Sequence, residues 1–153
     1  MALHAGDKAP EFDLPTDGGG RARLADYAGR TLVLYFYPKD DTPGCTTEAQ
    51  AFSAALPQFE AARAAIVGVS KDTPKKHDRF KAKYGLGFTL ASDETGEMLE
   101  RYGVWVQKSL YGRQYMGIDR ATFLIGPDGV IRHIWREVKV AGHAEAVLAA
   151  VTA

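Results

Sequence analysis

The feature that most constrains the fold is a continuous run of apolar and aromatic residues from Thr31 to Tyr37, bounded by Gly29 and Pro38. A run of this kind, without polar alternation, predicts a strand that is buried on both faces. Such a strand belongs in the interior of a sheet that has other elements packed on each side. The sequence therefore predicts a layered α/β structure in which residues 31–37 form a central strand.

The segments after this strand continue an alternation of helix and strand. From Pro43 onward, apolar residues recur at spacings of three and four, which predicts an amphipathic helix; they are Ala49, Phe52 and Leu56. Pro57 should break or restart this helix, because proline lacks a backbone N–H group and clashes with the preceding turn. Residues 59–64 still look helical, and the run from Ala65 to Ser70 predicts a second buried strand.

The remaining patterns complete a mixed sheet flanked by helices. In chain order they first predict a short strand pair or an irregular arm around 12–24, a helix over 74–84 that is capped by Asp72 or Thr73 and stops at Gly85, and a strand over 88–91. They then predict a brief helix over 94–102, a surface loop over 104–117, a hairpin over 121–135 and a last helix from about 142. A parallel strand-helix-strand half followed by a hairpin and a helix suits a thioredoxin-like α/β fold. We expect one domain over residues 1–153.

Composition excludes several classes of partner. Nineteen basic and nineteen acidic residues give a formal charge of zero, so no global field favours nucleic acid or an anionic membrane. The N-terminus lacks the basic start and apolar core of a signal peptide, and no stretch is long and apolar enough to span a membrane. One cysteine cannot form an internal disulfide, which fits a reducing compartment. We expect a cytoplasmic protein that acts on a small or neutral partner.

That single cysteine, Cys45, lies where the first strand pattern ends, a turn follows and a helix begins. The unpaired N–H groups at a helix start favour a thiolate over a thiol, which suggests a nucleophile. A small buried hydrophobic residue is the alternative, because free cysteines are among the most buried residues. Thr42 offers a hydroxyl three residues upstream, and Pro43-Gly44 permits a close approach of backbone N–H groups to a bound oxygen. Position alone leaves both readings open.

At this point the residues show a resemblance. The pattern Pro38-x-x-x-Thr42-x-x-Cys45 resembles the active-site signature of the peroxiredoxins, and the run from Tyr35 to Glu48 is similar to the bacterioferritin comigratory protein subfamily of thiol peroxidases. Further segments are similar to that subfamily in the same order; they are 67–70, 83–85, 90–93, 102–105 and 115–125. The resemblance covers nearly the whole chain, so it implies both the fold and the activity.

The resemblance also implies a role for each site residue. Cys45 is the peroxidatic cysteine, which attacks a peroxide oxygen and becomes a sulfenic acid. Thr42 and Arg120 are its helpers, since a hydroxyl and a guanidinium can stabilise the thiolate and the charge of the leaving oxygen. Pro38 shields the thiolate from water, and Glu48 holds Arg120. Gly44 supports the turn.

The sequence departs from the subfamily at Gln50. The commonest form there has a second, resolving cysteine five residues after the first, and this chain has glutamine at that position and no other cysteine. An external thiol must then reduce the sulfenic acid: glutathione, glutaredoxin, thioredoxin or Cys45 of another subunit. The alternative is a redox sensor or partner-binding protein that forms mixed disulfides through Cys45. We expect no metal and no cofactor, because the four histidines are scattered, and a monomer or weak homodimer.

Overall fold

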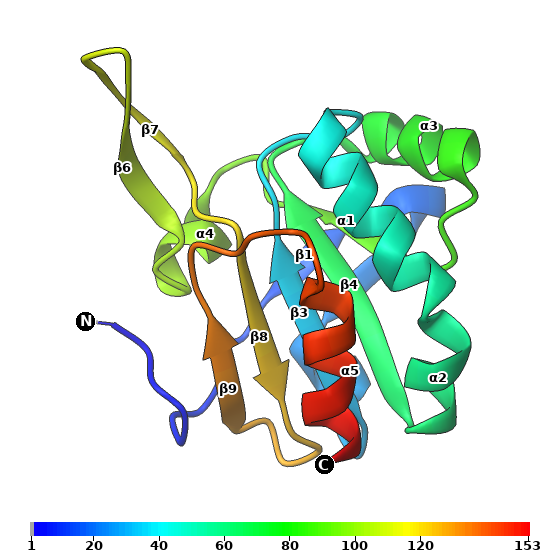
Figure 1. Ribbon diagram of the computed structural model, residues 1–153. Helices are drawn as coiled ribbons and strands as arrows, with labels where there is room; N and C mark the ends of the chain where they lie inside the picture. Colours follow the sequence, from blue (N-terminus) through cyan, green and yellow to red (C-terminus); the bar gives the residue numbers. More distant parts are fainter. Residues whose placement is uncertain (1) are drawn as a thin grey trace.

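The computed structural model describes residues 2–153 and is built around one five-stranded mixed sheet. Its strand order is β5 (Thr89–Ser92), β4 (Ala64–Ser70), β3 (Thr31–Phe36), β8 (Ala121–Ile125) and β9 (Ile131–Trp135). β3 pairs in parallel with β4 and antiparallel with β8, so it lies in the middle of the sheet (Figure 1). The predicted central strand, the second buried strand and the later hairpin are confirmed.

Helices cover both faces of the sheet, but most of them pack on the same face. α1 (Pro43–Ala54), α2 (Leu56–Ala61) and α5 (His143–Thr152) pack across the same face, and α3 (Pro74–Tyr84) lies near β5 (Figure 1). α4 (Glu97–Arg101) packs on the opposite face. The bounds agree closely with the predicted helices, with two exceptions: α2 ends at Ala61, before the predicted limit of 64, and α4 begins at Glu97, three residues after the predicted start at 94.

The side chains of β3 explain the continuous apolar run. Leu32, Leu34 and Phe36 point into one hydrophobic cluster, and Val33, Tyr35 and Tyr37 point into the other. The first cluster includes Leu99 of α4, and the second includes residues of the helix-covered face, among them Phe52, Phe59, Phe80 and Val147. Because successive side chains alternate across a strand, a strand with a core on each side must be apolar at every position.

Pro57 divides the helical segment after β3 into two helices, as the sequence predicts. α1 ends at Ala54, and Pro57 lies in the first turn of α2, where its missing N–H group costs nothing. Gly85 ends α3 in the left-handed conformation at φ 63°. Near the N-terminus, β1 (Asp13–Pro15) and β2 (Arg21–Arg23) form the expected short antiparallel pair, accompanied by the 3₁₀ helices η1 (Asp17–Gly19) and η2 (Leu24–Tyr27).

The predicted surface loop over 104–117 is wrong. This segment forms a two-stranded antiparallel hairpin of β6 (Trp105–Leu110) and β7 (Arg113–Ile118), which extends away from the main sheet (Figure 1). Tyr111 and Gly112 form its turn, both at positive φ (50° and 77°), as a two-residue hairpin turn of type I′ requires. Most of the hairpin's side chains are exposed, so the apolar alternation that identifies a half-buried strand is missing.

Within residues 2–153, none of the helices has the length and apolar character needed to cross a bilayer.

Candidate active site

Cys45 lies in the first turn of α1, directly after the loop that follows β3. Thr42 is extended (φ −101°, ψ 156°) and Pro43 is the first helical residue, so the helix begins two residues before the cysteine. The N–H groups of this first turn have no acceptor four residues back within the helix. Cys45 is only 2% exposed and packs in the cluster of Tyr35 and Phe52. The thiol is therefore buried at a helix start.

Arg120 contacts the sulfur directly. Its Nη2 donates a hydrogen bond to Cys45 Sγ over 3.4 Å. The sheet register brings the two together, because Phe36 at the end of β3 pairs with Ala121 at the start of β8, the residue after Arg120. Burial alone would lower the pKa of the guanidinium, but the charges of Glu48 and Cys45 outweigh burial and raise it. Arg120 thus holds a positive charge within hydrogen-bond distance of the sulfur.

Glu48 lies one helical turn after Cys45 and holds the other side of the guanidinium. Its Oε1 accepts a hydrogen bond from Arg120 Nη1 over 2.6 Å. The side chain is 2% exposed, and within residues 2–153 its second oxygen, Oε2, has no hydrogen-bond partner. Burial raises the pKa of this carboxyl to about 7 in spite of Arg120, which pulls it downward. Burial therefore has the larger effect on the pKa of Glu48, whereas the ion pair has the larger effect on the pKa of Arg120.

Gly44 gives Arg120 the space to reach the sulfur. A Cβ atom at this position would lie 3.2 Å from Arg120 Nη2, closer than most real Cβ contacts. The guanidinium therefore occupies the volume that a side chain at position 44 would fill. This contact supplies a reason for the small residue that turn geometry alone does not provide.

Thr42 and Pro38 make no hydrogen bond to the sulfur among the described residues. The Thr42 hydroxyl donates its proton to the carbonyl oxygen of Lys39 over 2.8 Å, which leaves the hydroxyl oxygen as an acceptor. Pro38 is exposed at the end of β3. Of the sequence-predicted residues, the structure joins Cys45, Arg120 and Glu48 by hydrogen bonds and places Gly44 against them.

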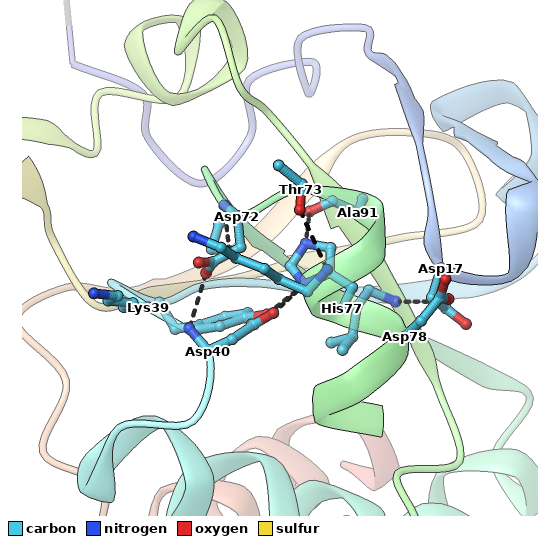
Figure 2. A network of polar contacts seen from close by, with 12 residues as sticks. Asp17, Lys39, Asp40, Asp72, Thr73, His77, Asp78 and Ala91 are labelled. Atoms are coloured by element: carbon cyan, nitrogen blue, oxygen red, sulfur yellow. Dashed lines mark hydrogen bonds and ion pairs between the residues drawn. The ribbon is translucent and has the colours of Figure 1, made fainter. Parts of the chain in front are cut away.

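A buried polar network holds the loop before α1, and sequence reasoning missed it. Asp40 Oδ2 lies 2.6 Å from Nδ1 of His77, whose Nε2 lies 3.0 Å from the carbonyl oxygen of Ala91 (Figure 2). His77 is fully buried, and Asp40 also accepts a hydrogen bond from the Tyr37 hydroxyl. Since Ala91 offers only an acceptor, one proton lies on Nε2 and another between Nδ1 and Asp40. These contacts fix α3 to the loop.

Further contacts tie the backbone of the same loop. Asp72 accepts a hydrogen bond from the Asp40 N–H group over 2.8 Å (Figure 2). Asp41, at a positive φ of 59°, accepts from Lys83 over 2.9 Å and from the Tyr84 hydroxyl over 2.6 Å. In the sequence, His77 is one of four scattered histidines and Asp40 and Asp41 carry no signal of these contacts. The spacing of His77 three residues before buried Phe80 placed it on the buried face of α3 and was the available signal.

The described residues offer no group of three or more histidine, cysteine or acidic side chains that could hold a metal ion. Gln50, at the position of the missing cysteine, is exposed. A nucleophilic sulfur buried at a helix start and bound by a guanidinium can attack an electrophilic atom and stabilise the departing charge. Fold and site together define a thiol-dependent redox enzyme.

The comparisons with known proteins identify the kind of enzyme. Residues 5–134 match the model of the AhpC/TSA family. Peroxiredoxin Bcp of Xanthomonas campestris is 52% identical over 147 residues, which cover 95% of this chain and 92% of that protein. The chain therefore belongs to the AhpC/TSA family and, within it, to the peroxiredoxins of the Bcp type, which are thiol-dependent peroxidases.

Solved structures agree with this assignment and confirm the thioredoxin-like fold. A cysteine-to-serine mutant of Xylella fastidiosa PrxQ superposes with a TM-score of 0.94 at 43% identity and covers 99% of this chain and 97% of its own. Xanthomonas campestris Peroxiredoxin Q superposes with a TM-score of 0.89 at 50% identity, covering 92% and 89%. Its solved forms include cysteine-to-serine mutants at two different positions, so it has at least two cysteines. Another structure concerns the alkyl peroxide reduction activity of the Xanthomonas bacterioferritin comigratory protein.

Proposed function

We propose that this peroxiredoxin reduces hydrogen peroxide and organic hydroperoxides through Cys45 alone, with the second thiol supplied from outside the chain. One observation carries the proposal: the only sulfhydryl of the sequence lies 3.4 Å from the guanidinium of Arg120. The alkyl peroxide reduction activity of the Xanthomonas relative supports organic hydroperoxides as substrates. At least two cysteines in that relative, against one here, make the reduction half of the cycle the point of difference.

In the first step the Cys45 thiolate attacks the terminal oxygen of the peroxide. The S–O bond forms as the O–O bond breaks, and the leaving oxygen takes a proton to become water or an alcohol. Arg120 stabilises the thiolate before attack and the leaving oxygen during it. Thr42, whose own proton is bound to Lys39, accepts the hydrogen of the peroxide and orients it. Pro38 limits the access of water.

Glu48 and Gly44 position the guanidinium in this mechanism. Glu48 holds one nitrogen at 2.6 Å, and the missing side chain at Gly44 leaves room for the other. Neither residue touches the reacting atoms. They act by fixing the charge that stabilises the transition state, which costs no reorganisation at the moment of reaction.

In the second half of the cycle an external thiolate attacks the sulfenic acid and releases water, and a second thiolate then frees Cys45 from the mixed disulfide. Glutathione, glutaredoxin and thioredoxin are the candidate reductants. We propose that the chain is a single domain that acts in the cytoplasm as a monomer or weak homodimer, with no resident cofactor.

The test is a steady-state assay with hydrogen peroxide and cumene hydroperoxide, using the glutathione, glutaredoxin and thioredoxin systems in parallel. Turnover in at least one system, abolished by Cys45→Ser, is the expected result. Peroxidase activity retained in Cys45→Ser would refute the assignment. Fast oxidation of the thiol with negligible turnover in all three systems would favour the redox sensor that signals through mixed disulfides.

A further inference from the structure

A groove of about 680 Å³ separates the loop before α1 from helix α3. Lys39, Asp40 and Asp41 form one wall, and α3 contributes Lys76, Arg79 and Lys83 to the other. This volume is within the ~300–1,000 Å³ typical of pockets that bind small molecules. Neither the peroxide step nor the contacts among Cys45, Arg120 and Glu48 involve this groove, so it is available for another molecule.

The groove has uncompensated positive charge. Lys39, Lys76 and Arg79 are exposed and, within residues 2–153, have no ion-pair partner. Asp41 is paired with Lys83, and Asp40 is bonded to His77. In the described part of the chain, Asp72 accepts hydrogen bonds only from the Asp40 N–H group and the Ser70 hydroxyl, so the groove has one carboxylate against three cations that have no ion-pair partner there. Because the whole chain has a formal charge of zero, this concentration of free cations is a local property. A ligand for the groove should carry carboxylates.

The groove also borders the segment that must move during the cycle. Cys45 is 2% exposed, so an external thiol reaches its sulfenic acid only after the loop before α1 or the first helical turn opens. Lys39 and Asp40 belong to that loop and lie at the edge of the network that holds it (Figure 2). A molecule bound in the groove would therefore contact the loop that has to move before an external thiol can reach the sulfur.

We propose that this groove binds the reductant, a small thiol that carries carboxylate groups, such as a γ-glutamyl tripeptide thiol. This inference rests on the proposed one-cysteine cycle and specifies its second substrate. The bound thiolate attacks the Cys45 sulfenic acid, so that an S–S bond forms, the S–O bond breaks and the departing hydroxide takes a proton to become water. A second thiolate then attacks the sulfur of the bound thiol in the mixed disulfide. This step releases the Cys45 thiolate and a disulfide of the two external thiol molecules.

The kinetic test compares thiols of different charge on matched variants. Glutathione is anionic, 2-mercaptoethanol neutral and cysteamine cationic. In Lys76→Gln/Arg79→Gln, kcat/KM for glutathione relative to 2-mercaptoethanol should fall by roughly three- to tenfold, since each lost surface charge pair contributes a modest amount. The same ratio with cysteamine in place of glutathione should rise. Lys75→Gln removes an exposed cation of α3 that does not line the groove, so it is the control and should change neither ratio.

A binding test does not depend on turnover. S-methylglutathione has the same carboxylates but no thiol, and its titration into the reduced protein should shift the NMR signals of residues 39–41 and 76–83. These shifts should weaken in the double variant and at high salt. The absence of NMR shifts at residues 39–41 and 76–83 would overturn the groove proposal, and so would kcat/KM ratios that are the same in the double variant and the wild type. Either result would leave the one-cysteine cycle intact. Failure of glutathione, glutaredoxin and thioredoxin alike to support turnover would instead overturn the cycle itself.

Discussion

Glu48 should make the protein less stable as the pH rises from about 5 to about 8. Burial raises the pKa of this carboxyl from 4.5 to about 7 in the folded protein, although Arg120 opposes the change. Between these values the folded protein holds a proton on Glu48 that the unfolded chain has already released. Raising the pH therefore favours unfolding across this window, and the effect is nearly complete about one pH unit above the folded pKa of about 7.

The size of the effect follows from the two pKa values. The interval from 4.5 to about 7, at about 1.4 kcal/mol for each pKa unit, corresponds to about 3 kcal/mol, of which about 2 to 3 kcal/mol falls between pH 5 and pH 8. Glu48→Gln keeps an oxygen for the Arg120 N–H group but cannot titrate. Relative to this variant, the wild type should lose about 2 to 3 kcal/mol in its free energy of unfolding over that range.

The comparison with the variant is necessary because His143 acts in the opposite direction. Burial, and to a lesser degree the charge of Arg120, lowers its pKa from 6.5 to about 4. Between these two values the unfolded chain binds a proton at His143 that the folded protein does not. The stability that the neutral, buried histidine contributes is therefore fully present above pH 6.5 and is lost as the pH falls toward 4. In the wild type alone the two contributions oppose each other. In the difference between wild type and Glu48→Gln, the histidine contribution cancels.

The assay is urea unfolding of both reduced proteins, followed by circular dichroism, at four pH values from about 5 to about 8. A difference in the free energy of unfolding that stays constant over this range would show that Glu48 does not hold a proton in the folded protein. It would also mean that Arg120 compensates fully for the burial of the carboxylate. Burial would then not control the protonation of Glu48.

Three further predictions concern the residues around the thiol and the loop. Arg120→Ala should lower the second-order rate constant for peroxide, followed by stopped-flow fluorescence, by on the order of a hundredfold or more, because it removes the charge that stabilises the leaving oxygen; a wild-type rate constant would exclude this role. Gly44→Ala should lower the same constant by less, since its Cβ would lie 3.2 Å from the guanidinium; an unchanged constant would mean that Arg120 moves without consequence. His77→Phe should lower the free energy of unfolding by about 3 to 5 kcal/mol, because Asp40 loses its buried partner; a loss below about 1 kcal/mol in urea unfolding would refute the network's importance.

The parts of the fold with strong local patterns could be predicted from the sequence. Residues 32–36 of β3 are apolar at every position because the strand has a core on each face. The side-chain cap of Thr73 and the backbone preferences of Pro74 and Gly85 mark the ends of α3. The hairpin β6–β7 could not be found in this way. Its strands pair mainly with each other and expose most of their side chains, and its turn residue Tyr111, 96% exposed at a positive φ, gives no conventional turn signal.

The candidate site also contains one feature that local sequence patterns predict and others that depend on tertiary packing. The place of Cys45 at a helix start follows from local pattern, but its contact with Arg120 spans 75 positions and depends on the register of β3 against β8. Residue patterns alone suggest that Arg120 is a solvated cation at the end of a strand. Only the resemblance to the peroxiredoxins indicates that it assists Cys45. The contact between Asp40 and His77 spans 37 positions, and no local pattern predicts it. Such contacts come from tertiary packing.

The most direct test of the central claim is mass spectrometry of the reduced protein, intact and as proteolytic peptides, after one equivalent of hydrogen peroxide and then after an excess of glutathione, with glutaredoxin and thioredoxin in parallel samples. We predict the addition of one oxygen atom on the Cys45 peptide, then its replacement by one glutathione in a mixed disulfide, and finally return of the reduced mass. Cys45→Ser should show none of these changes. An oxidised protein whose added oxygen lies elsewhere, or whose Cys45 sulfenic acid does not react with any external thiol, would contradict the one-cysteine cycle.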